Sequence, residues 1–183
     1  MKKTFFSSAD SGLAFTDPQD RSRYPVFFLN GRLWLASNLR RFEAFQSVSH
    51  GNNDADNLYG LLYRCDEELE SVIPVGLRLP SVEELEGFFL KWKDMIAVHP
   101  LDVASVLKCY GDIPLAGTAF LANPCGVPQF EDFDEKGFYI TGSRDEQGYR
   151  LAVCISRDGC KTTRVQPGQH CSIRLTFNNE ALN

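Results

Sequence analysis

The chain has few or none of the concentrated features that mark several classes of protein. Its six cysteines among 183 residues lie well below the ~8–10% typical of a disulfide-built scaffold. No Cys-x-x-Cys pair occurs, so neither a zinc knuckle nor a thioredoxin-type site has support. No apolar run is long enough to cross a membrane, and we expect no membrane insertion. No basic block accompanies the formal net charge of -5, which argues against nucleic acid as the main partner.

Sequence motifs of the common catalytic classes are also missing. There is no glycine-rich phosphate loop, no Gly-x-Ser-x-Gly and no His-Glu-x-x-His. His50, His99 and His170 fall in expected loops or at the edge of an expected strand, apart from any Ser or Cys nucleophile motif. Isolated histidines of this kind are typical of the surface. The sequence therefore predicts no catalytic residue and no cofactor.

The beginning of the chain is polar. Its first six residues resemble the start of a secretory signal peptide, but Ser7, Ser8 and Asp10 interrupt the apolar segment. We expect residues 1–23 to form a loop-like N-terminal arm and residues 24–183 to form a single domain. Without a Sec signal, the expected setting is the cytoplasm, a phage particle or export by a non-Sec route.

The clearest local signal is a helix start. Pro80 favours an extended conformation for the residue before it. Ser81 then stands at the N-cap position and Glu84 follows three residues later, which predicts a capping box. The helix is expected from Val82 to about Lys93. Its apolar stripe, predicted to pack in the core, comprises Val82, Leu85, Phe89, Trp92 and Ile96.

The other patterns predict mainly β-structure. Asn30-Gly31 separates two β-forming runs, residues 26–29 and 32–36, and is the strongest short signal for a hairpin. A short helix is expected after Asp66. The C-terminal third contains four expected strands between turn residues: 137–141, 149–156, 160–165 and 171–177.

Two polar segments have a superficial likeness to metal sites. Asn52, Asp54 and Asp56 alternate as calcium ligands do, but Asn57 and Tyr63 stand where an EF-hand loop has Gly and Glu. We expect a plain surface loop there. We likewise expect a solvated loop at the acidic patch of Glu131, Asp132, Asp134 and Glu135. The cysteines are expected to be free buried thiols.

Several motifs occur in the order typical of one bacterial family. They are Trp34-Leu35-Ala36-Ser37-Asn38-Leu39, Tyr59-Gly60-Leu61-Leu62-Tyr63, Leu77-Arg78-Leu79-Pro80-Ser81-Val82-Glu83-Glu84-Leu85, Gly137-Phe138-Tyr139-Ile140-Thr141-Gly142-Ser143 and Ser172-Ile173-Arg174-Leu175. Over residues 26–177 the chain thereby resembles the Fibrobacter succinogenes major paralogous domain, a bacterial C-type-lectin-like domain.

The resemblance implies an α+β fold, in which two helices pack on a central antiparallel sheet beside a second small sheet and long loops. It also implies a non-catalytic module that binds a ligand or receptor, such as a protein or a glycan, as adhesin-like and phage receptor-binding proteins do. The Glu-Pro-Asn and Gln-Pro-Asp loops of calcium-dependent lectins are absent, so we expect calcium-independent binding. The oligomeric state stays open.

Two alternatives share this fold or setting. The first is a divergent enzyme of the formylglycine-generating type, with a cysteine pair drawn from Cys154, Cys160 and Cys171. The second is a structural subunit of a phage or secretion assembly.

The binding face is predicted on the C-terminal strands. Period-two alternation would turn Phe138 and Ile140 inward and the intervening residues outward. Tyr139 and Arg150 are the expected anchors, because Tyr and Arg are enriched among interface hot spots. The full predicted set is Tyr139, Thr141, Arg144, Arg150, Ser156, Lys161 and Thr163.

Overall fold

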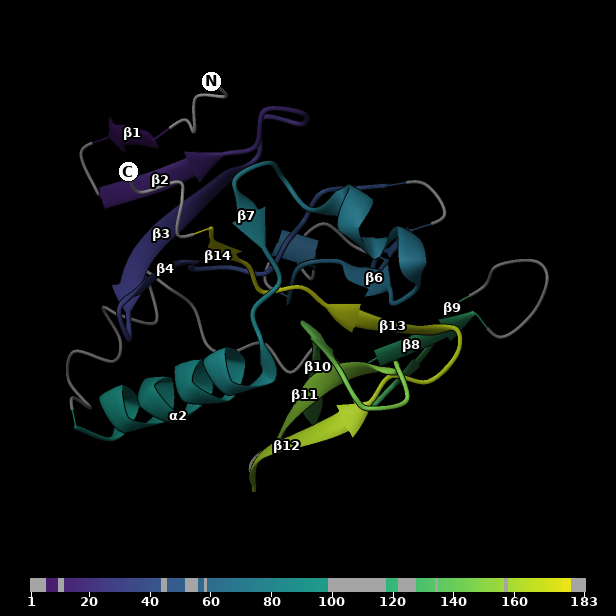
Figure 1. Cartoon of the computed structure of the whole chain (residues 1–183). Helices are drawn as coiled ribbons and strands as arrows, with labels where there is room; N and C mark the ends of the chain where they lie inside the picture. Colours follow the sequence, from purple (N-terminus) through teal and green to yellow (C-terminus); the bar gives the residue numbers. More distant parts are fainter. Residues whose placement is uncertain are drawn as a thin grey trace.

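The computed structural model of the chain describes residues 6–9, 12–43, 46–51, 56–57, 59–98, 118–121, 128–133, 135–156 and 158–178. Within these ranges the protein contains two β-sheets, a long helix, a short 3-10 helix and helical residues at 56–57 and 59 (Figure 1). This arrangement confirms the expected α+β class.

The first sheet has six antiparallel strands in the order β1-β2-β3-β4-β14-β7. At the predicted hairpin, Asn30 and Gly31 have φ values of 51° and 75°, as a type I′ turn requires. The hairpin is therefore confirmed. The strands are β1 (Phe6–Ala9), β2 (Gly12–Thr16), β3 (Arg23–Leu29), β4 (Arg32–Leu35), β14 (Thr176–Phe177) and β7 (Leu77–Arg78).

The N-terminal segment forms strands, not the expected loop-like arm. β1 and β2 extend the first sheet beyond β3. Phe15 of β2 is paired with Tyr24 of β3 and is 2% exposed. Its ring also meets Phe177 of β14 edge-on at 6.0 Å between centroids. The polar residues around β2 concealed this short strand, whose buried residues are Ala14 and Phe15.

The second sheet has the strand order β12-β11-β10-β13-β6-β5, and β8 and β9 branch from β13. Its members are antiparallel except for the parallel pair of β10 and β13. The strands are β5 (Ser47–Val48), β6 (Leu62–Arg64), β8 (Thr118–Leu121), β9 (Pro128–Glu131), β10 (Lys136–Arg144), β11 (Arg150–Ser156), β12 (Gly159–Arg164) and β13 (Gln169–Ser172).

The capping box at the start of α2 (Val82–Val98) is present. The Glu84 N–H donates to Ser81 Oγ at 3.2 Å, and the Ser81 N–H donates to Glu84 Oε2 at 2.9 Å. Val82, Leu85 and Phe89 are buried as predicted. The helix extends beyond Lys93, and the side chains of Trp92 and Ile96 lie outside the described residues.

The predicted short helix is the 3-10 helix η1 (Glu67–Val72). Asp66 caps it by accepting a hydrogen bond from the Glu68 N–H at 3.1 Å. Leu69 and Val72 are buried, so the apolar residues of this short turn anchor it to the core. Its acidic residues remain towards solvent.

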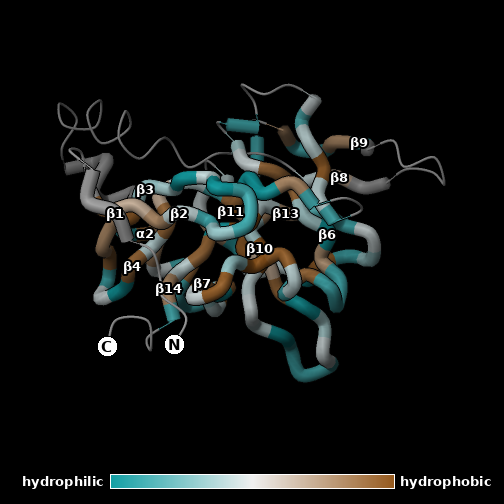
Figure 2. The backbone as a smooth tube through the Cα atoms, turned by 90° about the horizontal axis from the view of Figure 1, so that it is seen from above, coloured by the Kyte–Doolittle hydropathy of each residue, from teal (hydrophilic) through white to brown (hydrophobic). Residues whose placement is uncertain are grey.

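Two hydrophobic clusters lie on opposite faces of the β10–β11 ribbon. Helix α2 packs against one face, where Trp34, Phe89 and Tyr139 share a cluster. Ile140 and Ala152 belong to the other cluster, together with residues of both sheets. Figure 2 shows hydrophobic stretches along β4 and β10 and hydrophilic outer turns. The centre of β10 is consequently buried on both sides.

A buried segment at residues 173–175 carries the chain from β13 of the second sheet to β14 of the first. The Leu39 N–H donates to the Ile173 carbonyl at 2.9 Å, and the Leu35 N–H donates to the Leu175 carbonyl at 3.1 Å. The expected single strand over 171–177 is therefore wrong. It is two short strands, because the chain changes sheets between them.

The fold predicts unequal costs for two substitutions. Trp34 is 1% exposed and lies 4.6 Å from Phe88 between ring centroids, so Trp34→Ala should cost about 3–5 kcal/mol. Ser81→Ala should cost about 1 kcal/mol through loss of the N-cap. Chemical denaturation measures both values. An unchanged midpoint for Trp34→Ala would contradict the buried position of the ring.

A second prediction concerns acid stability. Hydrogen bonds from Arg78, at 2.7 and 2.8 Å, lower the pKa of Glu84 to about 2 from 4.5. Because the folded-state pKa is depressed, the contribution of this carboxylate is complete above pH 4.5 and is lost as pH falls towards 2. Glu84→Gln should therefore differ most from wild type near pH 5, and the difference should shrink on acidification.

Denaturant titrations at several pH values test this slope. Glu146→Gln, at an exposed residue of the β10–β11 turn, provides the control for a simple loss of charge. A Glu84→Gln variant whose deficit stays constant down to pH 2 would show that the ion pair does not control acid stability.

Candidate functional site

The seven residues predicted for the binding face do not share one face. In the β10–β11 register, Phe138 is paired with Cys154 and Tyr139 with Val153. Tyr139 and Thr141 thus lie on the side of Val153, opposite to Arg150 and the other candidates. Both are fully buried, so their expected outward orientation is wrong.

The physical reason is that β10 has a hydrophobic cluster on each face. Tyr139 packs against Phe89 of α2 at 4.9 Å between ring centroids, and burial raises the pKa of its hydroxyl. Thr141 Oγ1 donates to the Leu151 carbonyl at 2.7 Å. Alternation alone cannot reveal an exposed face in a strand that is covered on both sides.

Three further candidates lie towards the other end of the ribbon. Ser156 is paired with Gly159, not with Lys161 as expected, and Lys161 is paired with Cys154. Thr163 is paired with Ala152. Lys161 is exposed, and the other two are half-buried. The three share a polar face, as predicted, but the turn that closes the hairpin starts earlier.

Arg144 and Arg150 meet at a cleft of about 380 Å³. The cleft lies between the start of η1, the turn from β10 to β11 and the turn at residues 165–168. Its wall includes Arg64, Arg144, Arg150 and Tyr149, and we call it the arginine cleft. Two of the seven predicted residues are therefore brought together, with partners that are distant in sequence.

Arg150 is the deepest charged group of the arginine cleft. Its side chain is 5% exposed, and its Nη2 group donates to Glu70 Oε1 at 2.7 Å. Among the described residues its guanidinium makes no other hydrogen bond. A guanidinium carries five N–H donors, and no nitrogen of Arg150 is both buried and without a hydrogen-bond partner, so its remaining donors reach the water of the cleft. Arg150 is thus a largely buried cation with unused donors at the wall of a cleft.

The mouth of the cleft is charged and aromatic. Arg144 donates from Nη1 to the Gly148 carbonyl at 2.9 Å and lies 3.4 Å from Glu67 Oε2. Tyr149 is 52% exposed, and the Arg164 guanidinium lies 5.1 Å from the centroid of its ring. Arginines beside an exposed aromatic ring can hold an oxyanion and an apolar contact at once.

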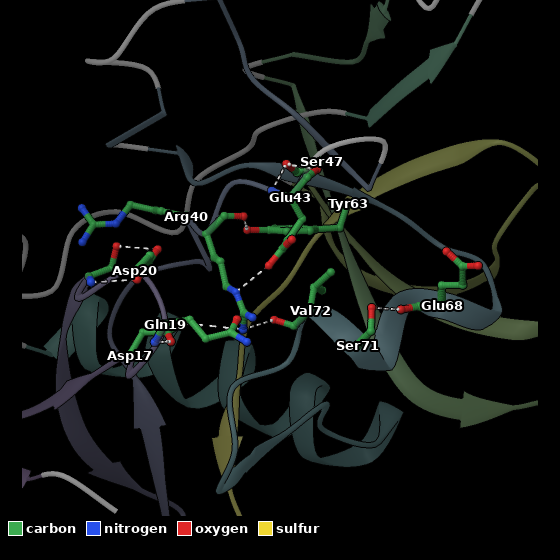
Figure 3. Close-up of polar contacts among 12 residues, drawn as sticks. Asp17, Gln19, Asp20, Arg40, Glu43, Ser47, Tyr63, Glu68, Ser71 and Val72 are labelled. Atoms are coloured by element: carbon green, nitrogen blue, oxygen red, sulfur yellow. Dashed lines mark hydrogen bonds and ion pairs between the residues drawn. The ribbon is translucent and has the colours of Figure 1, made fainter.

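A different group of charges, around Arg41, serves the interior. Its Nε donates to Glu43 at 2.8 Å, its Nη1 donates to the Val72 carbonyl at 3.2 Å, and Tyr63 Oη donates to its carbonyl at 2.7 Å. Figure 3 shows Glu43, Tyr63 and Val72 gathered at this point. Burial raises the pKa of the neighbouring Asp17 carboxyl. This group joins separate segments of the core and is closed to ligands.

The described cysteines do not form a reactive pair. Cys65, Cys154, Cys160 and Cys171 form no disulfide. Cys154 is paired with Lys161 and Cys160 with Ile155, so their side chains lie on opposite faces of the ribbon. Burial raises the pKa of the Cys154 thiol; a hydrogen bond with Cys65 and burial raise that of Cys171. A thiolate is therefore disfavoured at both. The remaining two cysteines lie outside the described residues.

Two of the histidines are buried, contrary to the expectation of surface residues. The His50 side chain is 3% exposed, and its Nδ1 lies 3.1 Å from Asp56 Oδ1. Its ring stacks on Phe130 at 5.5 Å between centroids, while Nε2 has no hydrogen-bond partner among the described residues. His170 is 1% exposed, and burial lowers its pKa. His99 lies outside the described residues.

No sequence signal identified His50, because its aromatic neighbours come from distant segments. Ser49 Oγ donates to the same Asp56 carboxylate, so Ser49, His50 and Asp56 form one set of contacts that joins residues 49–50 to residue 56. Asn52 and Asp54 of the calcium-like segment lie outside the described residues.

The described residues contain no group of three or more His, Cys, Asp or Glu side chains that could hold a metal ion. In the acidic patch, Asp132 forms an ion pair with Lys136 at 2.9 Å, and Glu131 and Glu135 are exposed. Asp134 lies outside the described residues. The remaining acids of the patch thus have the character of the solvated loop that was expected.

Comparisons of the chain with protein-family models, with curated proteins and with solved structures gave no match. No helix within the described ranges is long and apolar enough to cross a membrane.

These observations predict a domain that needs neither metal nor disulfides. Chelator and reductant should each leave the melting temperature unchanged, because the four described cysteines are free and the stability derives from the two hydrophobic clusters. Thermal melts with each reagent check this. A large fall with chelator would point to the 52–56 loop or the 131–135 patch as a site, and a fall with reductant would reveal a disulfide.

Proposed function

We propose that the protein is a non-catalytic binding module of the C-type-lectin-like kind, and that the arginine cleft is its binding site. The observation that carries the proposal is Arg150, a side chain 5% exposed whose guanidinium has unused donors at the cleft. Those donors face the cleft, where the oxygens of an anionic ligand can take the place of water as hydrogen-bond acceptors.

The C-type-lectin-like part of the proposal is supported by contacts between the motifs of the resemblance. Asn38 Nδ2 donates to the Tyr59 carbonyl at 2.8 Å. A Cβ on Gly60 would lie 2.5 Å from the Asn38 Cβ, so the two motifs fit together only with glycine at this position. Asn38 and Gly60 are each required by the position of the other, and such residues are the ones that a fold would retain when the rest of the sequence diverges.

The binding part is supported by the chemistry of the cleft. Arginine forks recognise oxyanions by paired hydrogen bonds, and the cleft is lined by Arg144, by Arg150 and by Arg64, which is paired with Asp66 of the same wall at 2.8 Å. Its described wall carries no activated nucleophile: Cys65 Sγ donates to the Tyr63 carbonyl at 3.4 Å. The cysteine positions likewise give no support to the alternative of a formylglycine-generating-type enzyme.

The test is a binding screen of purified protein on arrays of defined peptides and defined saccharides. For any probe that binds wild type, Arg144→Gln and Arg150→Lys should each weaken binding about tenfold or more, equivalent to ~1.4 kcal/mol. Arg150→Lys keeps the charge and removes the planar fork. Arg23→Gln, at an exposed arginine of β3 in the other sheet, is the matched control and should bind as wild type does.

Thermal melts of each variant separate a binding defect from unfolding. Arg144 is 41% exposed, so its variant should melt within a few degrees of wild type even if Arg150→Lys does not. A probe that binds both cleft variants as tightly as it binds wild type would place the binding site elsewhere.

A further inference from the structure

Two arginine contacts at the cleft already show what kind of group fits it. Arg144 is paired with Glu67 and Arg150 with Glu70. Both acids come from η1 and are three residues apart, so they lie on the same side of one helical turn. The chain thus presents its own pair of carboxylates to its own pair of arginines.

These internal contacts are easily exchanged. The Glu67 side chain is 88% exposed and its oxygen lies 3.4 Å from Arg144. The Glu70 side chain is 58% exposed and accepts a single hydrogen bond from Arg150. The Arg144–Glu67 pair is exposed on both sides, and such pairs contribute only about 0–1 kcal/mol because water competes for both partners; in the Arg150–Glu70 pair only the carboxylate is open to water. An incoming carboxylate would therefore displace or join them at low cost.

The shape of the cleft favours recognition of side chains. Its strand residues come from β6, β10 and β11, which all have neighbours on both sides within the second sheet. No free strand edge is available there for a peptide to extend the sheet. The volume of about 380 Å³ suits a few side chains, not a whole folded element.

The rim favours a peptide over other oxyanions. Exposed Tyr149 with Arg164 on its ring presents the two residue types enriched at protein–protein hot spots. Arginine clusters are also a recurrent means of recognising acidic peptide motifs.

We propose that the arginine cleft binds an acidic peptide segment that carries two carboxylates about one helical turn apart, in the places now taken by Glu67 and Glu70. This inference rests on the proposed binding function of the cleft. In the free protein the two glutamates act as a weak internal competitor for the ligand.

The first test uses two capped, fluorescently labelled peptides. One copies residues 66–71 of the chain, and in the other each carboxylate is replaced by an amide. Fluorescence anisotropy should detect binding of the acidic peptide to wild type, weaker binding to Arg144→Gln by tenfold or more, and no binding of the amide peptide. The acidic peptide should also bind less tightly as salt is raised.

The second test removes the internal competitor. Glu70→Gln should bind the acidic peptide about threefold more tightly than wild type, because Arg150 is released. Glu68→Gln is the matched control: it has the same charge change in the same helix, but Glu68 accepts a hydrogen bond from Gln46 at 2.9 Å, whereas Glu70 accepts one from Arg150. The control should bind as wild type does.

Each contrary result has a distinct meaning. Equal binding of the amide peptide, or an equal gain for both glutamate variants, would overturn the inference of specific carboxylate recognition. An acidic saccharide that binds through Arg144 and Arg150, with no binding of the acidic peptide, would overturn the peptide class but leave the proposed site intact. Binding of the acidic peptide without dependence on either arginine would overturn both the inference and the proposed site.

Discussion

The fold depends on one buried passage, residues 173–175, where the chain leaves the second sheet and enters the first. Arg174 is 3% exposed at its centre, and no carboxylate pairs with it among the described residues. Its Nη1 donates to the Leu35 carbonyl at 3.2 Å, and its guanidinium lies 5.7 Å from the centroid of the Phe88 ring. Burial lowers its pKa, whereas a contact with Tyr139 opposes that shift.

A buried cation without a counter-ion is expensive, so every group around Arg174 must keep its position. Leu35 belongs to the first sheet, Tyr139 to the second and Phe88 to α2. The guanidinium therefore joins the three layers of the molecule at one point. Hydrophobic contacts could hold the layers together, but a fixed set of acceptors also determines their relative position. Of the motif residues, Trp34 packs on Phe88 and Asn38 forms a hydrogen bond with Tyr139, so both contact residues of this junction.

Local signals in the sequence predicted local structure well. The Asn30-Gly31 turn needs two positive φ values, and the Ser81–Glu84 box needs only a spacing of three; neither depends on the rest of the chain. The face of β10 could not be predicted in the same way. Its alternation is real, but helix α2 covers one face and the first sheet's residues share the cluster on the other, so Tyr139 and Thr141 are both buried. Burial on both sides is a property of the tertiary arrangement.

The arginine cleft also shows what the sequence alone cannot predict. Arg144 and Arg150 were predicted from residue type, and they do meet at a cleft. Their acidic partners are 77 and 80 residues away in the sequence, so no spacing could have linked η1 to this hairpin. The sequence also gave no sign that Arg150 would be buried while its partner Glu70 stays 58% exposed.

The difference in exposure between Arg150 and Glu70 distinguishes a rigid arginine from a glutamate that a ligand can replace. Arg150 is the first residue of β11, and its backbone carbonyl accepts a hydrogen bond from the Val165 N–H, just after β12, at 3.0 Å. Its side chain is therefore positioned by the sheet before any ligand arrives, and little conformational entropy remains to be lost on binding. The glutamates opposite it lie on a short helix with their carboxylates in water. Arg150 is thus fixed in place, whereas the glutamates are held weakly. A ligand carboxylate could replace a glutamate at the arginine and leave the fold intact.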